Sequence, residues 1–356
     1  MKNIAYIELD THAEIAQHFM DIMKGSEIFS VDYYFSEKIN KQIVGNDDTV
    51  YLSDSSVISD QLKNKKYDLV IIGTVHRYFN TFLKITREYN TSVIVHNLHF
   101  SQITKLDLIK NTFKEDVMYR LKLWWKEGLS DATKVYKNAK NLLVLDEQMS
   151  TEKLHFLPLF YTRNQKNMNT HVLTIVIPGS VSQKRRDYHT VFQKISEFEM
   201  SFKNELTSDN QLLEFVFLGK AKGNELKKMI DLEDALNYIN IKYFTERVSA
   251  EEFTQWMQKA DVLWCPIQPE TKFFSQKEVY GKTKMTGNLG DAISYGKPAV
   301  FPANYQSAYE FIIPEEENIL QQFQDIRNFT FGFEEKYSRE KIQKKLEYVL
   351  HQLITA

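Results

Sequence analysis

Cysteine is nearly absent from this chain: Cys265 is the single one among 356 residues. One thiol cannot form an intrachain disulfide or a metal site of several cysteines, so we expect a reduced, cytoplasmic setting. No stretch approaches the roughly 20 apolar residues that span a membrane. The apolar run Ile4–Ile7 is also too short for a signal peptide.

An excess of charge of one sign is missing as well. The chain has 45 Lys and Arg against 47 Asp and Glu, a net charge of −2. Nucleic acid normally requires a strongly basic face, so we do not expect it as a partner. A hydrophobic fraction of 43% and an aromatic fraction of 13% exclude wholesale disorder and predict ring-rich cores. The length exceeds that of one ordinary core and predicts two domains.

Short apolar runs alternate with longer amphipathic stretches. The runs span residues 4–9, 68–73, 92–96, 141–145, 172–177, 214–218, 241–244, 262–265 and 299–301. They are continuous, as in strands covered on both faces. Amphipathic stretches lie between them, and one has a capping box, Ser249 and Glu252, at its start. Strands that alternate with helices predict parallel α/β sheets.

This alternation occurs twice, with a break near Pro158 and the polar stretch 163–169. We predict an α/β protein of two Rossmann-like, doubly wound domains that face a cleft. The predicted parts are an acceptor-side domain over 1–160, a linker over 161–170, a donor domain over 171–335 and a terminal helix over 336–356.

The loop after the run 172–177 combines a glycine, Gly179, with three consecutive cations, Lys184, Arg185 and Arg186. Glycine lets a backbone approach a ligand closely. The cations open the next predicted helix, although the helix dipole favours anions there. The loop therefore predicts a phosphate site, and a solvated charged turn is the alternative.

A second basic, glycine-bearing loop spans residues 278–291 and contains Lys282, Thr283 and Lys284. Such a loop before a helix can hold phosphate through N–H groups and charge. It lacks the spacing of a Walker loop, and the chain has no Gly-x-Gly-x-x-Gly, which disfavours a dinucleotide dehydrogenase. A flexible loop is the alternative interpretation.

Residues 172–305 resemble the donor domain of GT-B glycosyltransferases, particularly glycosyltransferase family 4 and its relatives. The segment Ala-Asp-Val-Leu-Trp-Cys-Pro over 260–266 resembles the family's Ala-Asp-Val strand that ends in proline. The segment Asp-Ala-Ile-Ser-Tyr-Gly-Lys-Pro over 291–298 resembles its Glu-Ala-Met-Ala-x-Gly-Lys-Pro helix.

The resemblance implies roles for individual residues. Gly179, Ser180 and Arg185 match the Gly-Arg-Leu loop and the following lysine, which contact the donor diphosphate in the family. Asp291 matches the glutamate that binds ribose. Arg247 and Val248 lie in the loop that receives the nucleobase. We add Lys282, Thr283 and Lys284 to the expected diphosphate site.

Two positions depart from the family pattern. Ser180 stands in place of the arginine, with Arg186 or Lys184 as the candidate replacement. Thr283 stands in place of the first glutamate of the family's pair, and Glu278 lies five residues too early. These departures leave the retaining or inverting course open.

Histidines follow the predicted strands of the first half. His12 follows Asp10 after the first run, His76 follows the run 68–73, and His96, Asn97 and His99 end or follow the run 92–96. Histidine titrates near neutrality and serves as a general base. We expect His12, Asp10 and His96 in catalysis and His76, Asn97 and His99 on the acceptor side, with structural roles as the alternative.

The resemblance implies a glycosyltransferase that moves a hexosyl or N-acetylhexosaminyl group from a nucleotide-diphosphate sugar to a hydroxyl of a sugar or lipid-linked acceptor. It implies a place in bacterial surface polysaccharide or glycoconjugate assembly. We expect no bound metal, because Asp-x-Asp is absent, and no cofactor beyond the nucleotide-sugar co-substrate. A nucleotide-sugar epimerase and a non-catalytic binding protein are the alternatives.

Tryptophans and lysines stand side by side in the segment 119–126. Such residues suit the interface of a membrane, so peripheral contact with the inner membrane is one interpretation. Packing of these rings on the sheet is the other.

Overall fold

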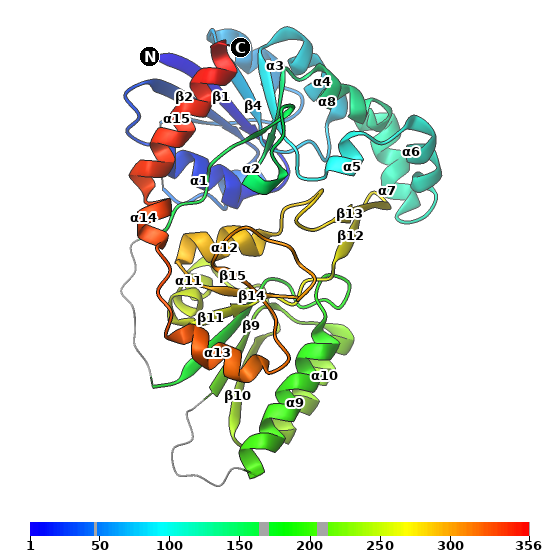
Figure 1. Cartoon of the computed structure of the whole chain (residues 1–356). Coiled ribbons are helices and arrows are strands. Elements are labelled where there is room, and N and C mark those ends of the chain that lie inside the picture. Colours follow the sequence, from blue (N-terminus) through cyan, green and yellow to red (C-terminus); the bar gives the residue numbers. More distant parts are fainter. Residues whose placement is uncertain (46–47, 164–170, 205–212, 356) are drawn as a thin grey trace. The chain divides into compact units, whose positions relative to one another are not determined.

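The computed structural model describes residues 1–45, 48–163, 171–204 and 213–355 (Figure 1). The chain forms two compact units. Unit 1 comprises Met1–Phe160, Lys272–Met285 and Arg339–Ala356, and unit 2 comprises Tyr161–Thr271 and Thr286–Ser338. Residues 164–170 of the predicted linker lie outside the described residues.

Unit 1 is built on a parallel sheet of seven strands in the order β3-β2-β1-β4-β5-β6-β7. The strands are β1 Lys2–Glu8, β2 Phe29–Phe35, β3 Val50–Leu52, β4 Leu69–Ile72, β5 Thr91–Ile94, β6 Asn141–Val144 and β7 Leu154–Phe156. The four apolar runs of the first half all form strands of this sheet.

Helices connect and cover these strands. They are α1 Ala13–Met23, α2 Glu37–Asn40, α3 Ile58–Gln61, α4 Phe79–Glu88, α5 Leu98–Ser101, α6 Lys105–Thr112, α7 Val117–Lys122, α8 Ala132–Asn138 and the terminal α15 Arg339–Thr355. Shorter turns are η1 Leu62–Asn64, the π-helical η2 Leu123–Glu127, η3 Leu129–Asp131 and η4 Glu147–Met149. Rings fill part of the core, as the aromatic content predicts: Tyr6 stacks on Phe19 with centroids 4.7 Å apart.

Unit 2 is built on a parallel sheet of six strands in the order β10-β9-β8-β11-β14-β15. The strands are β8 Leu173–Pro178, β9 Leu213–Lys220, β10 Ile239–Phe244, β11 Val262–Trp264, β14 Ala299–Phe301 and β15 Ile312–Pro314. The helices are α9 Tyr188–Asn204, α10 Gly223–Ala235, α11 Ala250–Lys259, α12 Gly287–Tyr295, α13 Ile319–Arg327 and α14 Phe333–Tyr337. The predicted α/β class with two parallel sheets is confirmed.

Two segments belong to a unit that the sequence does not predict. The hairpin of β12 Glu270–Phe273 and β13 Gln276–Val279 leaves unit 2, and residues 272–285 pack in unit 1. The terminal helix α15 also packs in unit 1, where Arg339 donates to the carbonyls of Asp21 and Lys24. The order of elements along the chain does not reveal that a segment leaves one unit and packs in the other. The predicted donor domain, 171–335, therefore has different bounds from the observed unit 2.

Both sheets reverse strand order between their first and fourth strands, β1 and β4 in unit 1 and β8 and β11 in unit 2. In open α/β sheets, ligands bind beyond the carboxyl ends of the strands at such a switch point. The loops after these strands are therefore the places where each unit can hold a ligand.

Candidate functional site

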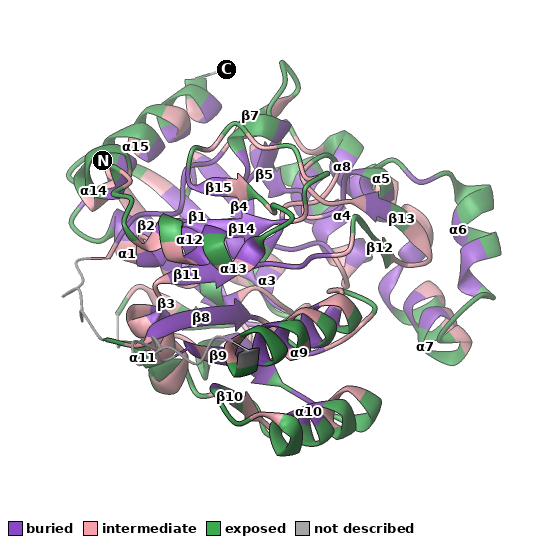
Figure 2. Cartoon of the chain, turned by 60° about the horizontal axis from the view of Figure 1, so that its bottom comes forward, coloured by how far each residue is buried: buried purple, intermediate pink, exposed green. Residues whose placement is uncertain are grey.

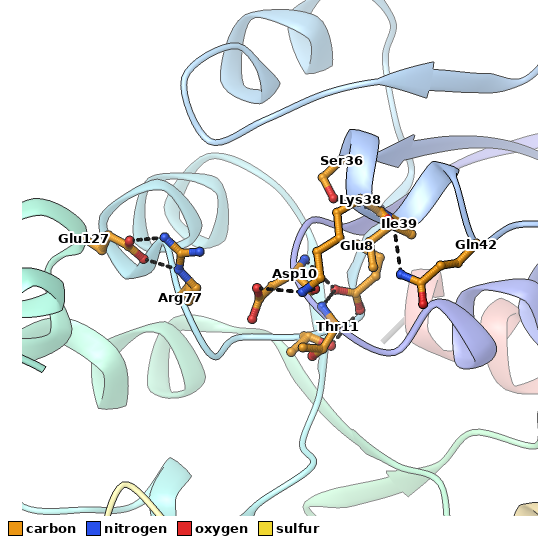
Figure 3. Close-up of polar contacts among 10 residues, drawn as sticks. Glu8, Asp10, Thr11, Ser36, Lys38, Ile39, Gln42, Arg77 and Glu127 are labelled. Carbon is orange, nitrogen blue, oxygen red and sulfur yellow. Dashed lines mark hydrogen bonds and ion pairs between the residues drawn. The ribbon is translucent and has the colours of Figure 1, made fainter. Parts of the chain in front are cut away.

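Glu8 is a fully buried carboxylate at the carboxyl end of β1. It accepts hydrogen bonds from the backbone N–H groups of Asp10 and Thr11 (3.1 and 3.2 Å) and from the Thr74 hydroxyl (2.6 Å). Figure 3 shows Glu8 beside Asp10 and Thr11, which lie in the loop after β1. Burial raises the pKa of Glu8 to about 7, although the hydrogen bonds act to lower it. Glu8 thus joins the loop after β1 to the loop after β4.

His12 follows Glu8 and begins α1 in the left-handed backbone conformation, with φ of 64°. Its Nδ1 lies 2.9 Å from a carboxylate oxygen of Glu14. An ionised carboxylate only accepts hydrogen bonds, so Nδ1 carries a proton, and in the neutral ring Nε2 is then the nitrogen with the lone pair. Asp10, the other residue expected in catalysis on this loop, forms an ion pair with Lys38 (3.7 Å; Figure 3), and its part in catalysis stays a prediction.

His96 and His76 complete a cluster of three imidazoles with His12. The ring of His96 stacks on that of His12 with centroids 4.0 Å apart, and the ring of His76 lies 6.0 Å from His12 and 5.8 Å from His96. Burial, and after it the electrostatic effect of the neighbouring His12, holds the pKa of both His76 and His96 well below the ordinary value. Both are therefore neutral at physiological pH.

Hydrogen bonds fix the orientation of these two rings. His96 donates from Nε2 to the Gly73 carbonyl (2.8 Å). The Asn97 amide donates to Nε2 of His76 (3.1 Å), and the Lys284 ammonium donates to the Asn97 carbonyl oxygen (2.7 Å). His96 and His76 thus use Nε2 for structural bonds, whereas the bond from His12 to Glu14 uses Nδ1.

The hairpin of β12 and β13 forms part of this cluster. The ring of Phe273 lies 4.3 Å from that of His76. The fully buried Glu278 accepts from the backbone N–H groups of His99 and Phe100 at the start of α5 (3.2 and 2.9 Å). The Thr283 carbonyl accepts from the N–H of Leu98 (2.9 Å). Glu278 is thus a structural residue that holds the hairpin on α5.

The placement of the hairpin changes the expected diphosphate site. Lys282, Thr283 and Lys284 belong to unit 1, whereas Gly179, Ser180 and Arg185 belong to unit 2. Lys282 is exposed, and the Thr283 hydroxyl closes the turn by accepting from the Val279 N–H (2.8 Å). Contact of these three residues with a diphosphate stays a prediction.

The remaining predicted residues of unit 1 lie beside the cluster. His99 is exposed, and its Nδ1 donates to the Lys277 carbonyl (2.8 Å). It therefore contacts the hairpin rather than the rings of His12, His76 and His96. The loop after β4 is held further along by a bidentate ion pair between Arg77 and the buried Glu127 (3.1 and 2.5 Å; Figure 3).

In unit 2, Gly179 directly follows β8 with φ of 103°, a conformation that favours glycine. A side chain at Gly219, near the end of β9, would meet the Gly179 carbonyl oxygen at 2.2 Å. The two glycines therefore let the end of β9 pack directly under the loop after β8.

Arg186 lies over this loop. Its guanidinium donates to the Ser180 carbonyl (3.3 Å) and to the Asn288 side-chain oxygen (3.1 Å). The Asn288 amide donates in turn to the Pro178 carbonyl (3.2 Å) and to the Asp291 carboxylate (3.3 Å). These contacts bring the loop after β8 to the first turn of α12.

The first turn of α12 completes the arrangement. Thr286 caps the helix by accepting from the N–H of Asn288 (3.4 Å), and a side chain at Gly287 would meet only open space. A helix N-terminus and a guanidinium both favour an anion. Among the three consecutive cations, Arg186 is held against Gly179, whereas Lys184 and Arg185 are exposed on the turn.

Arg247 and Val248, the expected nucleobase contacts, lie in the loop after β10. Arg247 is exposed and Val248 is partly buried. Their contact with a nucleobase stays a prediction. Asp291, the expected ribose contact, lies in the first half of α12 beside Asn288, where it is partly buried.

A separate cavity of about 430 Å³ opens beyond the ends of β11, β14 and β15. Its acidic lining residues are Asp187, Glu315, Glu316 and Glu317. Carboxylates repel phosphate, so this cavity does not suit the diphosphate of a nucleotide sugar.

Metal binding and membrane crossing find no support in the described part of the chain. Over residues 1–45, 48–163, 171–204 and 213–355, no group of three or more His, Cys, Asp or Glu could hold a metal ion. Within those same ranges, no helix is long and apolar enough to cross a membrane.

The fold of the whole chain is similar to that of several solved structures. The UDP-GlcNAc 2-epimerase from Methanocaldococcus jannaschii has a TM-score of 0.55 and 10% identity, covering 98% of this chain and 99% of that one. The UDP-GlcNAc 2-epimerase from Neisseria meningitidis, bound to UDP-GlcNAc, has 0.54 and 11%, covering 99% and 100%. An alpha-glucosyltransferase in complex with UDP has 0.51 and 9%, covering 100% of both.

Identities this low show the fold alone, which is of the GT-B type. No family model and no curated protein matches the chain.

Proposed function

We propose that this protein is a glycosyltransferase that uses a nucleotide-diphosphate sugar as donor and transfers the sugar to a hydroxyl acceptor. The observation that carries the proposal is the loop after β8, where Gly179, Arg186 and the N-terminus of α12 meet. The solved structures of similar fold that contain UDP or UDP-GlcNAc support the class of ligand.

In this proposal unit 2 holds the donor. The diphosphate lies against Gly179 and Ser180, with Arg186 and the α12 N–H groups as its positive partners and Asp291 toward the ribose. In this proposal Arg186 has the role that the resemblance gives to Arg185 and to the family's arginine, in whose place Ser180 stands. As the bond from the sugar carbon to the phosphate oxygen breaks, these groups stabilise the charge on the leaving nucleoside diphosphate.

Unit 1 supplies the base. His12 takes the proton of the acceptor hydroxyl on Nε2 while that oxygen forms its bond to the sugar carbon. Glu14 stabilises the imidazolium that results, because its carboxylate accepts from Nδ1 (2.9 Å). His76, Asn97 and Lys284 line the cluster as candidate contacts to acceptor hydroxyls.

The direct test is nucleotide release from a panel of nucleotide sugars, measured with and without sugar and lipid-linked acceptors. The proposal expects release that depends on an acceptor and a product that carries the sugar. Binding of nucleotide sugars with no transfer and no hydrolysis would favour a non-catalytic binding protein instead.

A nucleotide-sugar epimerase is the second candidate, and the histidine cluster gives it specific support. Neutral imidazoles beside a buried carboxylate whose pKa is about 7 suit removal and return of a proton at a sugar carbon. In deuterated water, an epimerase would place deuterium in the sugar ring without any acceptor, whereas a transferase would not.

The proposed pathway follows only from the resemblance of the sequence, and the proposed cellular setting follows from the single cysteine, Cys265. We propose that the product enters bacterial surface polysaccharide or glycoconjugate assembly and that the protein acts in the cytoplasm.

A further inference from the structure

An exposed apolar surface lies on α6, α7 and the following η2 turn of unit 1. We call it the α6–α7 surface, and it consists of Leu106, Ile109, Phe113, Met118 and Trp125. Four of these side chains are largely exposed: Leu106 by 70%, Phe113 by 63%, Met118 by 80% and Trp125 by 85%. Figure 2 shows α6 and α7 with exposed residues along their length. Large apolar residues gathered in this way indicate a binding surface.

The backbone beneath this surface is well anchored. Leu108 and Leu123 are buried, and the Trp124 indole donates to the Thr112 hydroxyl (2.8 Å), which ties η2 to α6. The segment therefore packs on its inner side while the apolar side chains of the surface stay outside.

Arg120 provides a second anchor. It is buried, donates to the Ser275 hydroxyl (2.9 Å) and lies 5.5 Å from the centre of the Phe274 ring. Arg120 thus holds α7 on the tip of the β12–β13 hairpin, the segment that also carries Phe273 and Lys284 to the histidine cluster.

Exposed lysines alternate with the apolar residues along the same segment. Lys105, Lys110, Lys114, Lys122 and Lys126 are all exposed. Of the nearby carboxylates, Glu115 pairs with Arg120 (3.6 Å) and Asp107 accepts from the Thr104 hydroxyl (2.7 Å). Residues 105–126 are thus net positive, whereas the whole chain carries a net charge of −2.

We propose that the α6–α7 surface docks unit 1 on a lipid surface that carries anionic headgroups. Phe113, Met118 and Trp125 enter the headgroup region, and the lysines meet lipid phosphates. A second copy of the chain does not fit as the occupant, because two identical surfaces rimmed by lysines repel each other. The proposal does not depend on nucleotide binding or on catalysis.

The test is flotation of the full chain with phosphatidylcholine vesicles, with and without phosphatidylglycerol, in the absence of nucleotide. We expect binding only to the anionic vesicles. The double variant Met118→Ser/Trp125→Ser should lower the partition coefficient more than about tenfold, because it removes the inserted side chains. The matched control is Phe329→Ser, a similarly exposed (66%) aromatic residue of unit 2, and it should bind as the wild type does.

Charge is tested separately. Lys122→Gln and Lys126→Gln should each lower the partition coefficient about fivefold, and binding should weaken as salt rises. The control pair Lys227→Gln and Lys228→Gln removes exposed lysines from α10 and should leave binding unchanged.

Three outcomes would overturn the proposal. One is that the wild type binds neither kind of vesicle. Another is that the Met118→Ser/Trp125→Ser variant binds as well as the wild type. A third is that this variant dissociates an oligomer in sedimentation while vesicle binding is absent, which would make the surface an interface between copies. Nucleotide binding by the same variants, measured apart, should equal that of the wild type, so failure of the donor site would not affect this result.

Discussion

The loop after β1 in unit 1 and the loop after β8 in unit 2 occupy the same position in two sheets with the same order of their first strands. Their chemistry is opposite. After β1, the buried Glu8 accepts from the N–H groups of its own loop, and His12 follows. After β8, Gly179 has no side chain to cover its backbone, and the cation Arg186 lies over the loop.

This difference teaches how one fold position serves two purposes. In unit 1 an internal carboxylate already occupies the N–H groups of Asp10 and Thr11, so the loop is built to hold a histidine in place. In unit 2 the charges beside the loop attract an anion. We therefore assign proton transfer to unit 1 and diphosphate binding to unit 2, and the following predictions test that division.

The largest effect is expected at His12. His12→Ala should lower the transfer rate about 10²- to 10⁴-fold, the usual contribution of a general base, and leave donor binding intact. The measurement is steady-state turnover together with a donor titration. His99→Ala, a change at an exposed histidine that contacts Lys277, should keep a rate close to that of the wild type. Equal rates for His12→Ala and His99→Ala would show that His12 of unit 1 is not the base.

Glu8 should make stability depend on pH. Its pKa rises from an ordinary 4.5 to about 7 in the folded protein, so its contribution is fully present below about 4.5 and is lost as pH rises through about 7. A shift of this size corresponds to about 3 kcal/mol. Glu8→Gln keeps an acceptor for the loop and cannot ionise, so it should lack this part of the pH dependence.

Denaturant unfolding between about pH 5 and 8 measures this effect. The exposed Glu246→Gln serves as the control and should follow the wild type. If Glu8→Gln loses stability with rising pH as steeply as the wild type, Glu8 is not the group responsible.

A smaller effect is expected at Gly179. Gly179→Ala and Gly223→Ala both place a side chain at positive φ (103° and 60°), which costs about 1–2 kcal/mol. At Gly179 the new carbon would also lie 2.3 Å from the Arg186 guanidinium, whereas Gly223 faces open space. Gly179→Ala should therefore weaken nucleotide binding about tenfold, the scale of one disturbed charged hydrogen bond, and Gly223→Ala should not. If Gly179→Ala and Gly223→Ala bind the nucleotide with equal affinity, Arg186 does not contact the ligand.

Much of the sheet architecture could be predicted because both sheets are parallel and covered on both faces. All nine continuous apolar runs form strands. The strand β2 was not among them, because Ser30 and Asp32 interrupt its apolar run. Asp32 is buried only because Lys65 (2.9 Å) and Tyr67 (2.6 Å), distant in the sequence, bind its carboxylate. The sequence around Asp32 does not show that these distant residues bind its carboxylate.

The candidate site could be predicted where it follows from strand ends. His12, His76, His96 and Asn97 come from three loops and meet as the strand-end rule predicts. The partner of His12 could not be predicted, because Asp10 and Glu14 are equally near in sequence and only the turn into α1 selects Glu14. The place of Lys284 could not be predicted either, because sequence order does not show that the chain leaves unit 2 and returns.

The central claim is that the loop after β8 binds the diphosphate of a nucleotide sugar through Arg186. Calorimetric titration of the wild type, Arg186→Ala and Arg185→Ala with a panel of nucleoside diphosphates tests it most directly. We expect at least one to bind, with a loss of about 1.5–3 kcal/mol in Arg186→Ala, the scale of a hydrogen bond to a charged group, and a smaller loss in Arg185→Ala. No binding of any nucleoside diphosphate at millimolar concentration, or equal affinity of Arg186→Ala and the wild type, would contradict it.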